Sequence, residues 1–157
     1  VAHALVWLSN PQPDDVFLDP FCGSGTIASE RAAYDAKRII ACDLSIDAVS
    51  VARQNCPSRV EIHNWDCRNL GLGPSEVTKL VTNPPWGTQI GGVEEIPELY
   101  LGFLKEARRV LAAHGKIVLL TDQSQAIEDA CQRLDLSFRP LHRVSLHGLV
   151  PTVYEIG

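Results

Sequence analysis

Four short segments of the sequence contain side chains that could do chemistry, and each follows a run with the pattern of a buried strand. They are Asp19–Thr26 (DPFCGSGT), Asp43, Asp66 and the tetrapeptide Asn83-Pro84-Pro85-Trp86. In open parallel sheets, ligands bind at the carboxyl ends of the strands. We therefore expect the four segments to meet in one site.

The first segment is a glycine loop between a strand and a helix. Gly23 and Gly25 allow a tight turn and a close approach to a ligand, because glycine has no Cβ. Gly23 to Ala28 also satisfies the pattern G-x-G-x-x-A, and Asp43, roughly twenty residues later, is placed to accept hydrogen bonds from ribose hydroxyls. These features predict a cofactor of the adenosine type without choosing among such cofactors. The alternative is a plain turn and a surface aspartate.

Two further acids favour S-adenosylmethionine over NAD. Asp19 stands at the strand end before the glycines, where a carboxylate attracts a cationic amino-acid group and repels a pyrophosphate. Asp66 follows the third strand and is suited to accept a hydrogen bond from an adenine amino group. The alternative for Asp66 is a solvated acid at a strand end. We predict a methyl-donor pocket.

The tetrapeptide after the fourth strand is suited to holding an amine. Two prolines fix the backbone and remove two N–H donors, which leaves carbonyl oxygens pointing outward. The side-chain carbonyl of Asn83 and the backbone carbonyl of Pro84 could together hold both hydrogens of an exocyclic amine, which is catalysis by orientation. Trp86 offers a face for stacking a planar base. The alternative is a rigid turn with a core tryptophan.

Strand and helix patterns alternate along the chain. This order predicts an α/β protein with a mostly parallel sheet covered on both faces. The N-cap pattern at Ser45 and the apolar spacing that follows it mark one of the helices. Expected strands lie at Val16–Asp19, Arg38–Asp43, Val60–Trp65, Lys79–Thr82 and Lys116–Thr121, with a final pair within Ser137–Ile156, and expected helices at Ser24–Tyr34, Ser45–Asn55, Glu95–Ala113 and Ser124–Leu134.

The composition is that of one globular domain without a membrane span. The 157 residues include 14 Lys+Arg against 19 Asp+Glu, a formal charge of -5, which argues against holding nucleic acid by bulk charge alone. Five scattered cysteines without a CxxC pair fit reduced thiols in the cytoplasm, and the histidine spacing predicts no metal site. The sequence has no methionine even at position 1, so we expect a piece of a longer protein.

Nearly the whole sequence resembles the methyltransferase domain of THUMP-containing RNA guanine-N2 methyltransferases. The matching runs are DPFCGSGTIASERA, ACDLSIDAVSVARQN, NWDCRNL and VTNPPWGTQIG. The glycine loop alone marks any class I methyltransferase, and N-P-P-aromatic marks enzymes that methylate amino groups; DPFCGSGTI combined with NPPWG is more specific. The resemblance implies a Rossmann-like class I fold over residues 1–157, with a mostly parallel seven-stranded sheet, helices on both faces and an antiparallel C-terminal strand.

The resemblance also assigns roles to individual residues. It implies that the glycine loop surrounds the methionine part of S-adenosylmethionine, that Asp43 holds the ribose, and that Asp66 and Cys67 hold the adenine. The target guanine would be held by Asn83, Pro84, Pro85 and Trp86. The expected cofactor-binding set is Asp19, Phe21, Cys22, Gly23, Ser24, Gly25, Thr26, Asp43, Leu44, Asp66, Cys67 and Asn83.

The expected substrate is a guanosine in tRNA. In the family a separate THUMP-bearing region N-terminal to this domain grips RNA, and the missing initial methionine agrees with such an arrangement. Two positions depart from the family: Trp86 stands where Tyr or Phe is frequent, and Thr88 and Gln89 occupy a stretch that often has a basic residue. The second departure puts the exact RNA substrate in question.

Other functions share some of these features. N-P-P-aromatic also suits ribosomal RNA guanine, DNA adenine N6 or a protein glutamine amide as the acceptor. G-x-G-x-x-A alone supports a nicotinamide-dependent oxidoreductase, but no hydride-transfer set of Ser, Tyr and Lys or of His and Asp accompanies it. A non-catalytic module with the same fold is disfavoured by the intact Asn83-Pro84-Pro85.

Overall fold

A seven-stranded sheet forms the centre of the molecule in the computed structural model, which describes residues 1–86, 95–146 and 148–157. Neighbouring strands run parallel except at β7, which is antiparallel to both β5 and β6. The strand order is β3-β2-β1-β4-β5-β7-β6. This confirms the predicted fold class, including the antiparallel C-terminal strand. The strands are β1 (Val16–Asp19), β2 (Arg38–Cys42), β3 (Val60–His63), β4 (Val77–Thr82), β5 (Leu111–Thr121), β6 (Phe138–Arg143) and β7 (Thr152–Ile156).

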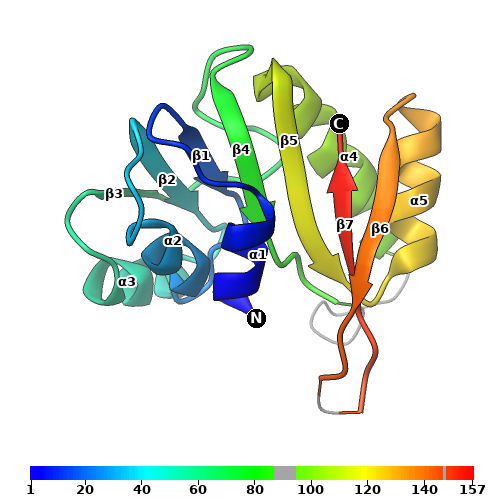
Figure 1. The fold of residues 1–157 in the computed structure, drawn as a ribbon, viewed down its shortest axis with the longest axis horizontal. Helices are drawn as coiled ribbons and strands as arrows, with labels where there is room; N and C mark the ends of the chain where they lie inside the picture. Colours follow the sequence, from blue (N-terminus) through cyan, green and yellow to red (C-terminus); the bar gives the residue numbers. More distant parts are fainter. Residues whose placement is uncertain (87–94, 147) are drawn as a thin grey trace.

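Helices cover both faces of the sheet (Figure 1). The buried residues of α1, α2 and α3 pack on one face, and those of α4 and α5 pack on the other. The helices are α1 (Ala2–Leu8), α2 (Thr26–Arg31), α3 (Ile46–Asn55), α4 (Glu95–Val110) and α5 (Ser124–Arg133). None of these helices in the described ranges is long and apolar enough to cross a membrane.

Alternating side chains along the strands supply both cores. Phe17 and Ile39 pack under α1–α3, whereas their chain neighbours Leu18 and Ile40 pack under α4 and α5. All four are at most 1% exposed. Successive side chains of a strand point to opposite faces, so a strand buried on both sides is apolar throughout. This is why these strands could be predicted as short continuous apolar runs.

Most predicted elements are present, but one helix was not predicted and several bounds differ. The helix α4 ends at Val110 instead of the predicted Ala113, because residues 111–113 belong to β5. The helix α1 was not predicted, because it has only seven residues and no side-chain cap, and only Leu5 and Val6 are buried. The strand β5 begins at Leu111 instead of the predicted Lys116. A register irregularity in its pairing with β4 sets Leu111 opposite Val77, ahead of the regular ladder from Lys116. The predicted N-cap is confirmed: the hydroxyl of Ser45 accepts a hydrogen bond from the backbone N–H of Ala48 at 3.2 Å.

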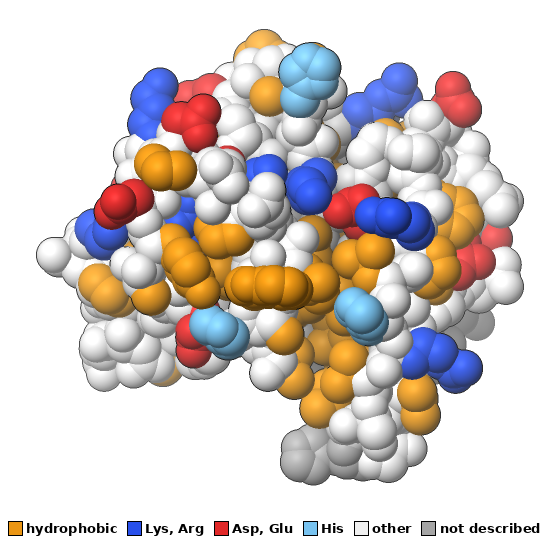
Figure 2. Space-filling view, viewed as in Figure 1, with side chains coloured by type: hydrophobic (Ala, Val, Ile, Leu, Met, Phe, Trp, Pro, Cys, Tyr) orange, Lys and Arg blue, Asp and Glu red, His pale blue; other side chains and the backbone are white. Residues whose placement is uncertain are grey.

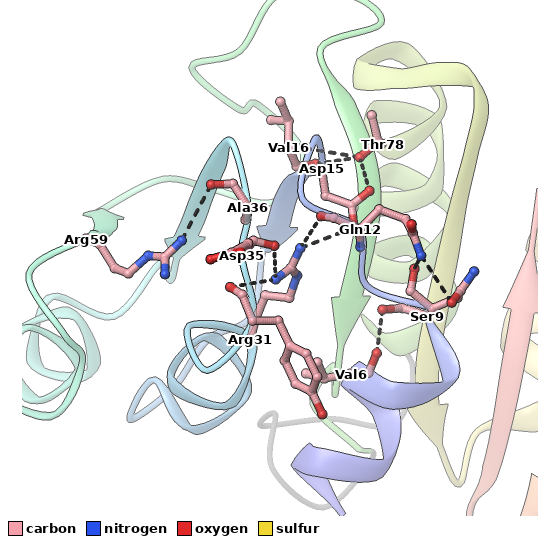
Figure 3. Close-up of polar contacts among 12 residues, drawn as sticks. Val6, Ser9, Gln12, Asp15, Val16, Arg31, Asp35, Ala36, Arg59 and Thr78 are labelled. Carbon is pink, nitrogen blue, oxygen red and sulfur yellow. Dashed lines mark hydrogen bonds and ion pairs between the residues drawn. The ribbon is translucent and has the colours of Figure 1, made fainter.

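A buried arginine ties several segments together at the amino end of β1 (Figure 3). Arg31, at the end of α2, is 0% exposed and donates to the carboxylate of Asp15 at 3.2 Å. Nη1 also donates to the backbone carbonyls of Tyr34 and Asp35, and Nη2 donates to that of Gln12. Asp15 also accepts the hydroxyl of Thr78 in β4. At this end of the sheet, the donors to the buried Asp15 carboxylate therefore all come from the protein itself.

Candidate active site

The glycine loop connects β1 to α2, and its two glycines serve different purposes. Gly25 is the N-cap of α2 at φ +86°, and a Cβ there would collide with the Sγ of Cys56 and crowd Ala52 of α3. Gly23 adopts φ +51°, and among the described residues no heavy atom lies within 4 Å of where its Cβ would be. Gly25 is thus required by the packing of α2 on α3, and Gly23 by the turn that borders open space.

Asp43 fixes this loop to the end of β2. One carboxylate oxygen accepts the backbone N–H of Gly23 at 2.9 Å, and the other accepts the backbone N–H of Ser45 at 2.9 Å. The backbone N–H of Cys22 adds a 2.9 Å bond to the carbonyl of Cys42. A carboxylate offers about four acceptor positions. Asp43 is therefore rigidly held and still has acceptor capacity on both oxygens.

Asp19 is completely buried at the end of β1. One of its oxygens accepts the hydroxyl of Thr82 at 2.7 Å and the backbone N–H of Phe21 at 3.3 Å. The other oxygen has no hydrogen-bond partner within the described residues. Burial raises the pKa of Asp19 to about 7; the bonds from Thr82 and Phe21 oppose this rise, and the nearby charge of Asp43 adds to it. A buried carboxylate with an unpartnered oxygen fits a site for a positively charged ligand.

Asp66 lies past the end of β3 and is held by its neighbour Arg68. The guanidinium donates through Nε to one carboxylate oxygen at 2.9 Å and through Nη2 to the other at 2.7 Å. The backbone N–H of Arg68 donates to the first oxygen as well. These interactions keep the pKa of Asp66 below its usual value, although burial opposes them. Asp66 is therefore a fixed, ionised acceptor.

In the tetrapeptide after β4, the asparagine is exposed and the backbone is held by a hydrogen bond from a buried tyrosine. Asn83 is exposed and Pro84 is buried. The carbonyl of Pro85 accepts the hydroxyl of Tyr100 at 3.1 Å, and this hydroxyl also contacts that of Thr121 at 2.7 Å. A buried tyrosine therefore binds the carbonyl of Pro85, and the predicted role of the Pro84 carbonyl as an acceptor for the amine stays a prediction.

Two pockets meet at this edge of the sheet. The first has a volume of about 320 Å³, and its lining includes Asp43, Leu44, Asp66, Cys67 and Pro85. The second has a volume of about 340 Å³, and its lining includes the start of α1 together with Cys22, Ser24 and Thr26. Phe21, Gly23 and Asn83 line both pockets. Asn83 therefore lies where the two cavities adjoin.

The structure brings most of the predicted site residues to these pockets. Asp19, which is buried at the base of the glycine loop, lines neither pocket, and neither do Gly25 and Pro84. Trp86 is partly buried against the core under α1–α3, so its stacking role stays a prediction. Thr88 and Gln89 lie outside the described residues. Sequence reasoning missed Arg68, Leu99 and the start of α1 as lining residues. Leu99 belongs to a predicted helix, but its apolar spacing indicated core packing and not a place beside a ligand.

The cysteines near the site are not suited to act as nucleophiles. Burial raises the pKa of the Cys22 thiol far above its usual value and that of Cys67 to about 12, and neighbouring carboxylates add to both shifts. These thiols stay protonated at neutral pH, and only a thiolate is strongly nucleophilic. We therefore interpret Cys22 as a small residue of the glycine loop and not as a nucleophile.

Comparisons with known proteins agree with this geometry. The chain is 31% identical over 162 residues to a tRNA (guanine(6)-N2)-methyltransferase of Thermus thermophilus, covering 99% of this chain and 48% of that protein. It is 30% identical to the tRNA (guanine(6)-N(2))-methyltransferase THUMP3 of Bos taurus, covering 98% of this chain and 34% of that protein. The chain thus spans half or less of the length of these relatives.

Solved structures give the same picture. The crystal structure of TrmN from Thermus thermophilus superposes with a TM-score of 0.83 at 30% identity, covering 99% of this chain and 47% of that one. SMU.472, a methyltransferase solved in complex with SAH, shares the fold at 20% identity with a TM-score of 0.74 over 98% of this chain and 51% of that chain. The family of RMKL-like methyltransferase domains matches residues 1–152. The chain therefore belongs to the RMKL-like methyltransferase family, as the resemblance predicted.

Proposed function

We propose that this domain transfers a methyl group from S-adenosylmethionine to the N2 amine of a guanosine in tRNA. The observation that supports this best is the place of Asn83. It lines both a pocket bordered by the fixed carboxylates Asp43 and Asp66 and a second pocket without them. A cofactor that lies along the glycine loop, which borders both pockets, and a base held by Asn83 would therefore meet beside this side chain.

The residues of the first pocket fit S-adenosylmethionine. The acceptor capacity of Asp43 suits a ribose diol. Asp19 lines neither pocket, but its unpartnered oxygen, buried at the base of the glycine loop, suits the cationic ammonium group of the same ligand. The apolar side chains of Leu44 and Leu99 also line the pocket, and its volume of about 320 Å³ lies within the range of small-molecule sites. When bound, the cofactor would supply an electrophilic methyl group on a sulfonium.

Asn83 would orient the nucleophile. Its side-chain carbonyl and the backbone carbonyl of Pro84 are acceptors for the two hydrogens of an exocyclic amine, so that the nitrogen lone pair faces the methyl group. Tyr100 supports this arrangement from the core, because its hydroxyl holds the carbonyl of Pro85. The amine loses its proton as the new bond forms, so no strong general base is required.

The choice of tRNA rests on the relatives and on the distribution of charge. The relatives named above are tRNA guanine-N2 methyltransferases, and the alignments cover half or less of their length. On the face shown in Figure 2, Lys and Arg side chains are dispersed among acids instead of forming a continuous patch. With a net charge of -5, this agrees with an RNA-binding region elsewhere in a longer protein. A cytoplasmic location for such an enzyme stays a prediction.

Asn83→Ala tests the proposal. We expect it to abolish methylation of tRNA by the protein and to leave the affinity for S-adenosylhomocysteine, measured by calorimetry, within a few-fold of wild type. The acceptor is lost from the amine, whereas the carboxylates of the cofactor pocket are intact. Gln125→Ala is a matched control, because it removes an exposed amide from α5 outside both pockets. An active Asn83→Ala variant would contradict the assignment.

Two measurements address the alternatives. Calorimetry with NAD in place of S-adenosylhomocysteine would reveal an oxidoreductase if NAD bound and S-adenosylhomocysteine did not. Nucleoside mass spectrometry of tRNA and rRNA from cells lacking the gene should show loss of N2-methylguanosine from tRNA. Loss from rRNA alone would keep the chemistry and replace the substrate.

A further inference from the structure

Arg68 lines the cofactor pocket beside Asp66, and no role follows for it from the predicted site. We propose that Arg68 is a positioning residue, which aims the Asp66 carboxylate at the 6-amino group of the cofactor's adenine and so makes the pocket select adenine. This inference rests on the proposed function, because it takes the ligand of the pocket to be S-adenosylmethionine.

The geometry of the Asp66–Arg68 pair leaves one carboxylate oxygen better placed to accept a hydrogen bond from the adenine amino group. Oδ1 of Asp66 accepts two N–H groups of Arg68, from the backbone and from Nε, both at 2.9 Å. Oδ2 accepts one N–H group, from Nη2 at 2.7 Å. The thiol of Cys67 adds a weaker interaction with the carboxylate. Counting the bonds from Arg68, Oδ2 is the oxygen with more capacity for a further donor, such as an exocyclic amine.

Two parallel hydrogen bonds from one guanidinium fix the plane of the Asp66 carboxylate, whereas a single hydrogen bond would allow it to rotate. An Arg–carboxylate pair with two parallel bonds combines strength with geometric specificity. Asp66 is 30% exposed and Arg68 is 50% exposed, so the pair is accessible from the pocket and contributes little to stability. The role of the Asp66–Arg68 pair is consequently to position Oδ2 of Asp66 and not to stabilise the fold.

The helix α4 is shaped to accept the stem of Arg68. A Cβ at Gly102 would lie 3.0 Å from Cδ and 3.1 Å from Cγ of Arg68. Glycine inside a helix costs roughly 0.5–1 kcal/mol relative to alanine. The aliphatic stem of Arg68 crosses α4 at Gly102, where the helix has no side chain. Gly102 therefore determines how closely the Arg68 guanidinium approaches the helix.

The experiment compares the affinity of the protein for S-adenosylhomocysteine with that for S-inosylhomocysteine, whose base has an oxygen in place of the 6-amino group. In the wild type we expect at least tenfold weaker calorimetric binding of the inosine compound, because a carbonyl oxygen faces the Asp66 carboxylate. In Arg68→Ala we expect the ratio of the two affinities to fall to within about threefold of unity, because the carboxylate turns away. Arg68→Lys should recover only part of the ratio, because an ammonium lacks the planar fork.

Gly102→Ala is a second variant that changes neither Arg68 nor Asp66. Alanine raises helix propensity, so the variant should fold with at least wild-type stability, whereas the added methyl group displaces the Arg68 stem. We expect the affinity ratio to fall severalfold. Arg38→Ala is the matched control, because Arg38 forms the same two-point pair with Glu61, at 2.9 and 2.8 Å, outside the pocket. It should leave the ratio unchanged.

Each result separates this inference from the proposed function. A wild-type protein that does not bind S-adenosylhomocysteine overturns the proposed function. A wild type that binds and discriminates, together with Arg68→Ala and Gly102→Ala variants that discriminate equally well, overturns the role of Arg68 alone. A ratio that falls equally in Arg38→Ala also overturns it, since the effect would then be a general loss of structure.

Discussion

The strand β1 has a buried aspartate at each end, and the two ends differ in one respect. Asp15 accepts the hydroxyl of Thr78 at 2.9 Å, and Asp19 accepts the hydroxyl of Thr82 at 2.7 Å, with both threonines on the neighbouring strand β4. At the amino end the guanidinium of Arg31 completes the site. At the carboxyl end one oxygen of Asp19 has no partner among the described residues.

The two aspartates at the ends of β1 therefore differ in whether the protein itself supplies all their partners. A buried charge is tolerated when it is paired and hydrogen-bonded, and it is costly when it is not. At the amino end the Asp15 carboxylate meets this condition within the chain, although Nε of Arg31 has no hydrogen-bond partner among the described residues. The carboxyl end meets it only when Asp19 binds a proton or a cationic ligand. We infer that the first aspartate serves folding and that the second serves binding.

The largest effect is expected from removing Arg31. Arg31→Met keeps an apolar stem but leaves the Asp15 carboxylate and three backbone carbonyls without their donor. Removing one partner of a buried ion pair costs about 3–5 kcal/mol. We expect the free energy of unfolding in urea to fall by this amount, with a thermal midpoint roughly 10 °C lower.

The control for this prediction is another arginine of the same region (Figure 3). Arg59 makes only long bonds, of 3.4 and 3.5 Å, to the carbonyls of Ala32 and Ala36. Arg59→Met should change the free energy of unfolding by less than about 0.5 kcal/mol. Folded Arg31→Met should bind S-adenosylhomocysteine as the wild type does, and a loss of binding would mean that the two ends of β1 are not separate.

At the carboxyl end of β1, Asp19→Asn should have the opposite effects: the free energy of unfolding should not fall, and the affinity for S-adenosylhomocysteine should. The amide is neutral and can still accept the hydroxyl of Thr82, so the free energy of unfolding at pH 8 should be unchanged or higher. The cationic group of the cofactor loses its counter-charge, however. A hydrogen bond to a charged group contributes about 1.5–3 kcal/mol, so affinity for S-adenosylhomocysteine should fall roughly 10- to 100-fold.

The pH dependence tests the same carboxylate. With the pKa of Asp19 raised to about 7, binding requires loss of a proton, so affinity should fall about tenfold from pH 8 to pH 6. The unfolded value is 3.8, so the native state of the free protein holds the extra proton between pH 3.8 and 7. Its contribution to stability therefore decreases as the pH rises through this window. Both dependences should be absent in Asp19→Asn.

The sequence predicted which segments meet at the site but not how each residue is used. Apolar runs and the residues after them identified Asp19, Asp43, Asp66 and Asn83, because strand ends converge in a parallel sheet. The distinct roles of Gly23 and Gly25 depend on what packs against each, and the Cys56 thiol beside Gly25 comes from the C-cap of α3, which is distant in the sequence.

Long-range partners explain the other limits of prediction. Arg31 has helical spacing that places it among small residues, and nothing local indicates its bond to Asp15. Arg68 follows Asp66 closely, but nothing local indicates that its stem packs against a glycine in α4. The helix α1 is too short for periodicity to reveal. Local patterns therefore predicted the framework, and contacts between distant segments decided the function of each side chain.

The smallest effects should come from the two threonines, which sharpen the comparison because they are chemically matched. Thr78→Val and Thr82→Val each remove one hydroxyl from a β1 aspartate, at a cost of about 1 kcal/mol. Thr78→Val also leaves the backbone N–H of Val16 without its acceptor, so this cost should appear in the free energy of unfolding, with cofactor affinity unchanged.

Thr82→Val should show its cost in binding instead. The hydroxyl of Thr82 lowers the pKa of Asp19, so its removal raises that pKa further and moves the pH midpoint of S-adenosylhomocysteine binding upward. Affinity at pH 7 should fall about fivefold and recover at pH 9, where the carboxylate is ionised again. A deficit that persisted at pH 9 would mean that Thr82 acts by shaping the pocket. Equal losses of stability in the two variants would mean that both ends of β1 are structural, because only a carboxylate kept ready for a ligand converts a lost hydrogen bond into a shift of binding pH.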